Sequence, residues 1–482
     1  MQILFNYNFN PEDIVDLDFE ALYEKRRRDS CFAFVFEKNE KIYALRDHFG
    51  IVPLYFSWRE NELVFSTTLD PLLTSKSRLD LQGYKTYIAL GTAKVLPLLE
   101  HIRIAPPGSV IEIDKRNKEI KPIYEYRFKK LRLDRSVKMS DLVQLLDHLL
   151  LQATKRTVKY DEVGLYLSGG IDSAITGVYL TKCGVKVNAY TCSRWGKQGS
   201  EMQYSTMNSE RIGVRYHYID ALDSKKVKES LDKIVDVYKV PNADPASIGI
   251  TSLQLHTPIS KEKQIYGGQG ADTINCAMSL LNIGYMSSFM PGFLRTKISP
   301  QMSNDIIDSC IRIRSRGLLN SKDMPQTIMN SIQAISGKIE RLSIAGMLIY
   351  HTPQDSETLS APTINSNILY SNPFYDVDVA EFFLGIHLRY RIRFSREYLA
   401  KRFLDKIVLR KLAGKHLDAE VIKIKKTFNI PLHLYGVDKE LEKFEARANI
   451  PSDIRSKFAA YILSKYCASR NINYGHHWHK EI

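Results

Sequence analysis

The first 130 residues place apolar and polar positions in the short runs that are typical of β-strands. Residues 31–36 form one apolar run, and Glu62–Ser66 alternates after a polar break. Pro106-Pro107-Gly108 then precedes Ser109–Asp114, in which apolar and polar residues alternate with a period of two. Alternation bounded by turn residues predicts strands that bury one face. We therefore expect a smaller, β-rich N-terminal domain over residues 1–130.

The pattern changes to helical spacing after a charged connecting stretch at 128–135. From Met139 onward, leucines recur at the three- and four-residue spacing of an amphipathic helix. A buried strand at 163–167, a Ser-Gly-Gly turn, a helix over 172–183 and a strand at 185–190 follow. A strand–helix–strand unit implies neighbouring parallel strands. The sequence thus predicts an α/β domain with a parallel sheet over residues 136–482, with further helices at 300–350 and 376–415.

Length and composition limit the class of protein. The 482 residues are enough for two or three domains with buried cores. Hydrophobic residues make up 44% and charged residues 25%, which is the balance of a globular protein rather than a disordered one. The 68 Lys+Arg against 54 Asp+Glu give a net charge of +14. That excess is compatible with a nucleic-acid partner, an anionic substrate or a solubility charge.

Targeting signals and cysteine spacing favour the cytoplasm. No run of 18 apolar residues occurs, so the sequence predicts no membrane span. The first residues lack a basic segment followed by an apolar one, so we expect no secretory signal. The six cysteines are scattered and form no Cys-x-x-Cys pair, as expected for reduced thiols.

The turn after the strand at 163–167 carries the clearest candidate chemistry. Leu167 leads into Ser168-Gly169-Gly170, and Ile171-Asp172-Ser173 opens the following helix. Glycines let the backbone approach phosphate oxygens, and the N–H groups at a helix N-terminus favour an anion. The serine hydroxyls can donate further hydrogen bonds, and Asp172 can hold a metal ion that bridges phosphates. The turn therefore predicts a nucleotide phosphate site.

Several later segments share a resemblance with this loop. Ser-Gly-Gly-Ile-Asp-Ser resembles the loop of enzymes that cleave ATP to AMP and pyrophosphate. Four further segments narrow the resemblance to the asparagine synthetase family: Gly268-Gln269-Gly270-Ala271-Asp272, Asn372-Pro373-Phe374-Tyr375-Asp376, Lys406-Ile407-Val408-Leu409-Arg410 and Lys425-Lys426-Thr427-Phe428-Asn429-Ile430-Pro431-Leu432. The resemblance covers roughly residues 31–435 with order and spacing kept.

The resemblance implies a fold, a reaction and a set of site residues. The fold is the parallel-sheet, adenine nucleotide alpha hydrolase-like ATP-pyrophosphatase domain. The reaction is the adenylation of a carboxylate by ATP with release of pyrophosphate, followed by attack of ammonia or an amine. Mg²⁺ is implied at Asp172 and Asp272, and charge stabilisation at Lys425 and Lys406. The implied ATP-binding residues are Leu167, Ser168, Gly169, Gly170, Asp172, Ser173 and Gly268.

The N-terminal domain resembles the second half of the glutaminase domain of that family. Phe32-Ala33-Phe34, the segment 46–55 and Pro106-Pro107-Gly108 carry the resemblance. The family's nucleophilic cysteine directly follows the initiator methionine, where this sequence has Gln2. Cys31 could take that role only after removal of 30 residues. We therefore expect a truncated, inactive glutaminase-like scaffold, with the nitrogen supplied as ammonia or as an amine.

Two departures from the family place the acceptor substrate in doubt. Thr273 follows Asp272 where a glutamate is usual, and Leu369-Tyr370-Ser371 stands where a Glu-x-Arg pair is usual. Asparagine synthetase-like amidation is therefore the leading interpretation. The alternatives are a biosynthetic amide ligase acting on a peptide, lactam precursor or sugar acid, then a tRNA-modifying ATP-pyrophosphatase, then a non-catalytic scaffold.

The remaining features carry weaker expectations. Glu201 resembles an acidic residue after the family's second strand, although a surface glutamate explains it equally well. His476-His477-Trp478-His479 is interpreted as a solvated tail rather than a metal site. The expected partners are a small-molecule or peptide carboxylate and an ammonia or amine donor, without membrane or nucleic acid. A homodimer is permitted by the sequence but not predicted by it.

Overall fold

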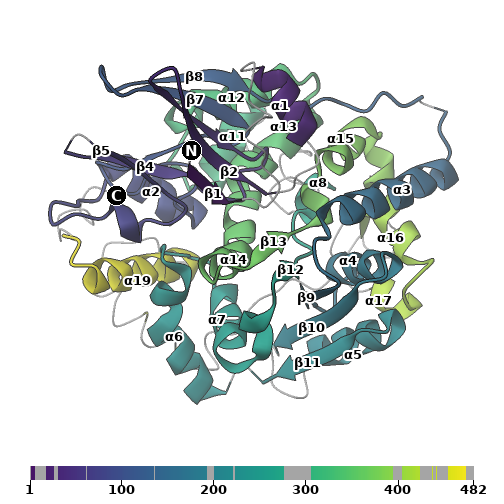
Figure 1. The fold of residues 1–482 in the computed structure, drawn as a ribbon. Coiled ribbons are helices and arrows are strands. Elements are labelled where there is room, and N and C mark those ends of the chain that lie inside the picture. Colours follow the sequence, from purple (N-terminus) through teal and green to yellow (C-terminus); the bar gives the residue numbers. More distant parts are fainter. Residues whose placement is uncertain are drawn as a thin grey trace.

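The structure is a computed structural model in which two domains pack against each other (Figure 1). The described residues are 2–5, 18–26, 31–60, 62–134, 136–192, 200–220, 223–275, 305–393, 404–423, 437, 441 and 454–473. None of the described helices is long and apolar enough to cross a membrane.

The N-terminal domain contains two antiparallel sheets, as its alternating pattern predicts. The first sheet has the order β1-β2-β3-β7-β8 and the second the order β5-β4-β6. The strands are β1 (Gln2–Phe5), β2 (Ala33–Lys38), β3 (Lys41–Arg46), β4 (Tyr55–Arg59), β5 (Glu62–Ser66), β6 (Arg103–Ile104), β7 (Ser109–Asp114) and β8 (Glu119–Glu125). Helices α1 (Phe19–Arg26) and α2 (Leu81–Leu90) complete the domain. The strands expected at 62–66 and 109–114 are confirmed with the predicted bounds.

The second domain is built on one five-stranded parallel sheet of order β11-β10-β9-β12-β13. Its strands are β9 (Glu162–Tyr166), β10 (Lys186–Cys192), β11 (Arg215–Ile219), β12 (Gln264–Tyr266) and β13 (Leu369–Ser371). The parallel sheet and the separate β-rich domain confirm the fold class expected from the sequence.

Helices cover both faces of the parallel sheet because successive residues of a strand point to opposite sides. Leu165 of β9 lies against Gly177 of α4, where an added Cβ would come 3.0 Å from its side chain. The next residue, Tyr166, accepts a hydrogen bond from Gln254 of α7 and contacts Thr363 of α14. The helices that surround the sheet are α3 (Met139–Thr157), α4 (Ile171–Lys182), α5 (Ser200–Ile212), α6 (Ser224–Tyr238), α7 (Ala246–His256) and α14 (Thr352–Asn365).

The later part of the chain mixes short helices with one small sheet. Its helices are α8 (Ala271–Ile274), α11 (Ile306–Arg314), α12 (Gln326–Ala334), α13 (Lys338–Ala345), α15 (Val377–Gly385), α16 (Ile407–Ala413), α17 (Ala419–Lys423) and α19 (Ile454–Ser469). The helical prediction for 376–415 is incomplete, because β14 (Ile392–Arg393) pairs antiparallel with β15 (Leu404–Asp405). Strands of two residues form through pairing with a partner, which no local period signals.

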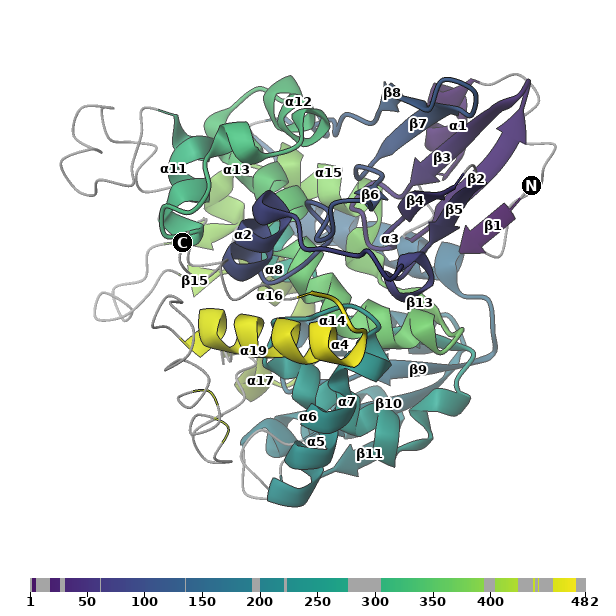
Figure 2. The same ribbon diagram turned by 90° about the vertical axis from the view of Figure 1, so that its left-hand side faces the viewer.

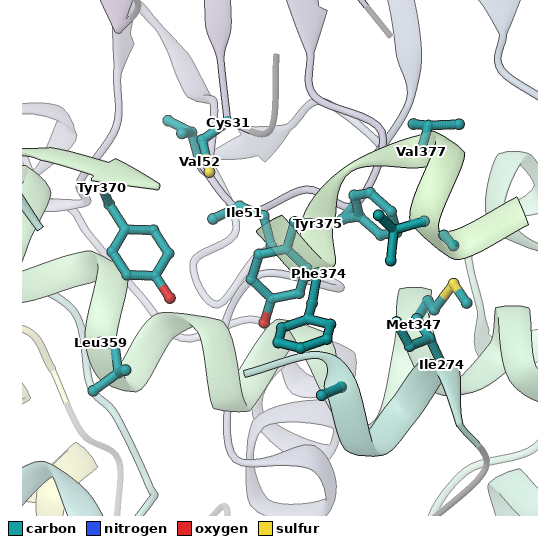
Figure 3. Close-up of a cluster of buried hydrophobic side chains, with 14 of the residues drawn as sticks. Cys31, Ile51, Val52, Ile274, Met347, Leu359, Tyr370, Phe374, Tyr375 and Val377 are labelled. Atoms are coloured by element: carbon teal, nitrogen blue, oxygen red, sulfur yellow. The ribbon is translucent and has the colours of Figure 1, made fainter. Parts of the chain in front are cut away.

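The two domains share an apolar core rather than a thin contact. Cys31, Ile51 and Val52 from the N-terminal domain belong to the same buried cluster as Phe374 and Tyr375 from the second domain (Figure 3). Apolar burial of this extent opposes relative movement of domains.

The C-terminal helix α19 adds a second contact between the domains, lying between α2 and α6 in the view of Figure 2. The Tyr87 hydroxyl of α2 donates to the carbonyl of Ala459 at 3.1 Å. The Arg470 guanidinium, just after α19, forms an ion pair with Asp70 at 2.9 Å. Helix α19 and the residue that follows it therefore connect the second domain to the N-terminal domain.

Candidate active site

The turn between β9 and α4 is shaped by its own serines. The Ser173 hydroxyl accepts a hydrogen bond from the Ser168 backbone N–H at 3.0 Å, and the Ser168 hydroxyl accepts one from Gly170 N–H at 3.1 Å. The Leu167 N–H donates to the Tyr190 carbonyl of β10, which continues the sheet into the turn. The serines therefore hold the loop in place before any ligand arrives.

The N-terminus of α4 points its donors into this turn. Gly170 is the N-cap residue, and none of the described side chains caps the helix there. The first N–H groups of a helix have no partners within the helix, and the helix dipole makes this end positive. Backbone donors and a positive dipole end together suit a phosphate group. The phosphate site expected at residues 168–173 stays a prediction, with which this arrangement is compatible.

The second loop crosses directly over the first turn of α4. A Cβ at Gly268 would come 2.5 Å from the Ser173 backbone nitrogen, so only glycine allows this approach. The Thr176 hydroxyl of α4 donates to the Gly267 carbonyl at 3.3 Å. This close contact places Asp272, at the start of α8, beside Asp172.

The segment after β13 holds the second loop from its other side. The Tyr370 hydroxyl donates to the Gln269 side chain at 2.9 Å, and the Asn372 amide donates to the Gln269 carbonyl at 2.8 Å. Asn372 also accepts from the Phe374 N–H at 2.9 Å. Asp376 caps α15 and pairs with Arg156 of α3. The run 372–376 therefore supports the second loop through these contacts.

Lys406 lies between the two aspartates. Its Nζ is 2.5 Å from Asp172 Oδ2 and 2.9 Å from Asp272 Oδ1. The Lys406 side chain is only 7% exposed, whereas that of Asp272 is 39% exposed, so the group opens to solvent on the Asp272 side. Three of the residues expected in the site, which lie up to 234 positions apart, are thus brought into direct contact.

The backbone around Lys406 is fixed by Arg410. Lys406 adopts a left-handed conformation, with φ of +55°, immediately before α16. Arg410 Nε donates to the Asp405 carbonyl at 2.8 Å, and its Nη2 pairs with the Asp405 carboxylate at 3.1 Å. A non-glycine residue holds this conformation only where its surroundings compensate the strain. Arg410 is therefore a positioning residue for Lys406.

Charge and burial act in opposite directions on this cluster. Burial raises the pKa of Asp172, and the ammonium of Lys406 works against that rise. Burial lowers the pKa of Lys406, but the carboxylates of Asp172 and Asp272 outweigh it and raise that pKa above its ordinary value. Lys406 therefore stays protonated at neutral pH, and it neutralises two neighbouring carboxylates.

The residues present fit a magnesium ion. Asp172 Oδ1 is buried and accepts no hydrogen bond from the described residues. Mg²⁺ in nucleotide enzymes is held by one or two carboxylates together with substrate phosphates. Asp172 and Asp272 supply two such carboxylates beside the helix terminus where the phosphates fit. The ion would screen the charge of a triphosphate and of the leaving pyrophosphate.

The other residues expected from the sequence lie outside this geometry. Lys425 falls outside the described residues, as do the four residues 476–479. Glu201 lies in α5, and its side chain is not among those described. Cys31 is 5% exposed and is packed in the apolar cluster between the domains.

The structure also brings together polar and charged residues that sequence reasoning missed. Arg314, Gln354 and Arg455 line one cavity at the domain junction. Asp355 and His351 occupy the neighbouring turn of α14, and burial raises the pKa of Asp355 to about 7 and lowers that of His351 to about 3. These positions carry no motif and no spacing that would mark them in the sequence.

Two family models match the chain. The model described as asparagine synthase matches residues 145–466, and the glutamine amidotransferase domain model matches residues 24–126. The first match alone covers more than half of the 482 residues. Both matches agree with the resemblance identified from the motifs.

Individual relatives are about a quarter identical to this chain over the regions that match. A Methanocaldococcus jannaschii protein described as a glutamine-hydrolysing asparagine synthetase is 26% identical over 337 residues, 61% of each chain. Asparagine synthetase [glutamine-hydrolyzing] 1 of Bacillus subtilis is 23% identical over 286 residues, 56% of this chain and 43% of that protein. The chain thus spans less than two thirds of the length of either relative.

Among solved structures, the NH3-dependent NAD synthetase of Campylobacter jejuni is 12% identical, with a TM-score of 0.22. It covers 42% of this chain and 96% of its own, and so low a score does not bear on fold or activity. The extent of the first family match, together with the order of motifs around the two loops, decides the assignment: the chain belongs to the asparagine synthase family.

Proposed function

We propose that this chain is an ATP-dependent amide synthetase that adenylates a carboxylate and transfers the acyl group to ammonia or an amine. The convergence of Asp172, Asp272 and Lys406 at the N-terminus of α4 carries the proposal. Carboxylates for Mg²⁺, a buried cation and unpartnered helix N–H groups are what a triphosphate needs there. The family match supports the same reaction class.

The proposed reaction has two steps. An oxygen of the substrate carboxylate attacks the α-phosphorus of ATP, the bond to the β-phosphate oxygen breaks, and pyrophosphate leaves. The nitrogen nucleophile then attacks the acyl carbon of the acyl-adenylate, and AMP leaves as the nitrogen loses a proton. Lys406 is placed to stabilise the negative charge that builds up on the phosphates in the first step. Lys425, expected to share this role, stays a prediction from sequence.

The ammonia-using form of this reaction is favoured by the N-terminal domain. Cys31 is buried in the apolar cluster, and a thiol there is inert compared with an exposed catalytic thiol. The domain would then serve as a scaffold through its shared core with the second domain. The nitrogen would arrive from solution or on an amine substrate.

A second candidate is a ligase of the same type whose acid is larger than aspartate. Thr273, Leu369 and Ser371 stand where the family usually has charged residues, and they are 1%, 7% and 3% exposed. Tyr370 uses its hydroxyl to hold Gln269 rather than to meet a substrate. Recognition of the acid would therefore depend on other residues. The match to an amidotransferase domain model at 24–126 disfavours the tRNA-modifying alternative.

Pyrophosphate release tests the proposal. The purified chain is incubated with ATP, Mg²⁺ and a panel of carboxylates, each with and without ammonia. We expect release with at least one acid, dependent on Asp172 and unaffected by Asp141→Ala, a change on the exposed face of α3. Release with aspartate and ammonia identifies asparagine synthesis, and release only with a larger acid identifies the second candidate. The proposal is contradicted if no acid supports pyrophosphate release and Asp172→Ala gives the same result as the wild type.

A further inference from the structure

A cavity lies where the N-terminal domain meets α11, α14 and α19. Gly91 enters it from the end of α2, Gln354 from α14, and Arg314, Arg316 and Arg455 from the end of α11 and the start of α19. It opens onto about 430 Å³ of unfilled space, including the solvent at its mouth. Three guanidinium groups in one cavity are unusual, because like charges repel unless an anion lies between them.

Arg314 is the most enclosed of the three. Its Nη2 donates to the Gln354 side chain at 3.1 Å, while its Nε is buried and has no hydrogen-bond partner among the described residues. Within the described part of the chain, no carboxylate forms an ion pair with Arg314. A buried guanidinium donor without an acceptor is costly, and a bound oxyanion removes that cost.

The surroundings of Arg314 leave the cavity positively charged. Burial, together with repulsion from Arg455 and Arg316, lowers the pKa of Arg314 to about 10. The carboxylates of Asp355 and Asp244 act against this, but burial also raises the pKa of Asp355 to about 7 and so weakens its negative charge. Among the described residues, the acidic groups that act on Arg314 against the other two arginines are Asp355 and Asp244.

The helix α19 adds to the positive potential. Arg455 and Ser456 lie in the first turn of this 16-residue helix, and Arg316 Nη1 donates to the Ser456 hydroxyl at 3.2 Å. The N-terminal end of a helix carries a partial positive charge from its aligned peptide dipoles. The arginines and the helix end therefore act on the same space.

The cavity is coupled to the proposed active site through the first turns of α14. Gln354 of α14 contacts Arg314 at 3.1 Å, and α8, which contains Asp272 of the second loop, packs against Gly346–Tyr350, the segment that leads into α14. The N-terminal domain keeps Gln354 in place, because a Cβ at Gly91 would come 2.5 Å from its amide nitrogen. An anion bound in the cavity would thus lie near the start of α14, the end of that helix that adjoins the second loop.

We propose that this arginine cavity binds a carboxylate of the acid substrate other than the carboxylate that is adenylated. Planar guanidinium groups pair with carboxylates through two parallel hydrogen bonds, which would give the cavity its selectivity. The assignment to the substrate rests on the proposed function, whereas the anion site itself does not. It also supplies the recognition that Thr273, Leu369 and Ser371 do not provide.

Binding of a dicarboxylate probe to the full chain tests the site without ATP. Isothermal titration with glutarate is compared for the wild type, Arg314→Gln, Arg455→Gln and the control Arg312→Gln. Arg312 lies on the same helix but pairs with Asp308 at 2.7 Å and does not line the cavity. We expect saturable binding to the wild type and the control, weakened at least tenfold in each of the other two variants. Circular dichroism melting verifies that the variants are folded, and Arg455→Gln serves alone if Arg314→Gln is not.

The outcomes separate the site from the function. Glutarate affinity that is equal in all four proteins overturns the proposal, as does the absence of saturable binding to the wild type. Inorganic phosphate that binds in place of glutarate, with the same dependence on Arg314, overturns the assignment to a substrate carboxylate. Pyrophosphate release is then measured with the acid that supports it, where we expect KM to rise at least tenfold in Arg455→Gln. Glutarate binding without any pyrophosphate release would contradict the proposed function and leave the anion site standing.

Discussion

Asp172 of the second domain and Cys31 of the N-terminal domain are both candidates for chemistry, but the fold gives their side chains different surroundings. Asp172 stands at a helix N-terminus, keeps one oxygen without a hydrogen bond from the described residues and faces a lysine. Cys31 lies in an apolar cluster that joins the domains. A buried polar group without a hydrogen bond from the described residues indicates a ligand site, whereas a thiol that belongs to a cluster of buried apolar side chains indicates packing.

The contrast extends to the residues around each group. Beside Asp172, the second loop packs directly on α4 because residue 268 is glycine, since a Cβ there would come 2.5 Å from the Ser173 nitrogen. Cys31 belongs to the same buried cluster as Ile51, Val52 and Tyr370 (Figure 3). We infer that chemistry in this molecule is concentrated in the second domain, and that the N-terminal domain contributes stability and the wall of the arginine cavity.

The largest expected effect comes from Asp172→Ala. Loss of a metal ligand beside the phosphate site should lower the rate of ATP-dependent pyrophosphate release by about 10³-fold. Asp172→Asn should be nearly as inactive, because its shape is kept but its charge is lost. Activity above a tenth of the wild-type value in either variant would break the contrast between the two domains. The control is Asp141→Ala, at an exposed position of α3.

Lys406→Met tests whether the ammonium of Lys406 and a metal ion bind the same two carboxylates. Without the ammonium, Asp172 and Asp272 repel each other, and we expect the unfolding free energy to fall by about 1–3 kcal/mol in EDTA. That value lies below the range for fully enclosed pairs because Asp272 is 39% exposed. Saturating Mg²⁺ should restore more stability to this variant than to the wild type. Thermal unfolding with and without Mg²⁺ measures both quantities.

The matched control for Lys406→Met is Lys411→Met, an exposed lysine on the same helix. It should behave as the wild type does in EDTA and in Mg²⁺. An equal response of all three proteins to Mg²⁺ would show that the two aspartates do not hold the ion together. The pairing of Lys406 with both carboxylates would then be structural only.

The sequence allowed much of the local structure around Asp172 to be predicted. The strand, the Ser-Gly-Gly turn and the helix follow one another in the chain, so hydrophobic spacing and glycine chemistry locate them within a few residues. The same holds for the hairpin strands at 62–66 and 109–114. Each of these depends on interactions between residues that are close in sequence.

The contacts between distant segments could not be derived from residue patterns alone. Lys406 reaches Asp172 across 234 positions, and it does so only because the two-residue strands β14 and β15 pair and Arg410 fixes Asp405. The arginine cavity joins residues from α2, α11, α14 and α19, none of which carries a motif. Tertiary packing decides such contacts, and periodicity reports only which face of an element is apolar.

His351 gives a prediction about pH at the junction of the domains. Burial, with repulsion from Arg314 and Arg455, lowers its pKa to about 3, against about 6.5 in an unfolded chain. Between these values the unfolded state binds more protons, so stability should fall as the pH falls from about 6.5, by at most about 1.4 kcal/mol per pH unit. Above pH 6.5 the contribution is constant. Urea unfolding of the wild type and His351→Gln across pH 4–8 measures the difference.

His148→Gln is the control for His351→Gln, since His148 is exposed on α3. Its stability curve should be parallel to that of the wild type, while His351→Gln should lose less stability in acid. Parallel curves for all three proteins would mean that His351 is accessible to protons in the folded state. In that case water would reach the region around His351 as readily as it reaches the cluster of Asp172 and Asp272.

The smallest effect is expected at Cys31, and it bears most directly on the contrast between the domains. Cys31→Ala removes one buried sulfur atom, which should cost about 1 kcal/mol of stability through the small cavity it leaves. The rate of pyrophosphate release with ammonia should stay within about twofold of the wild-type rate, because we expect Cys31 to take no part in the reaction at the phosphate loop. Cys183→Ala, at the half-buried end of α4, is the matched control. Glutamine that supports the wild type but not Cys31→Ala would make the N-terminal domain a working glutaminase, and the thiol's apolar surroundings would then describe only a resting state.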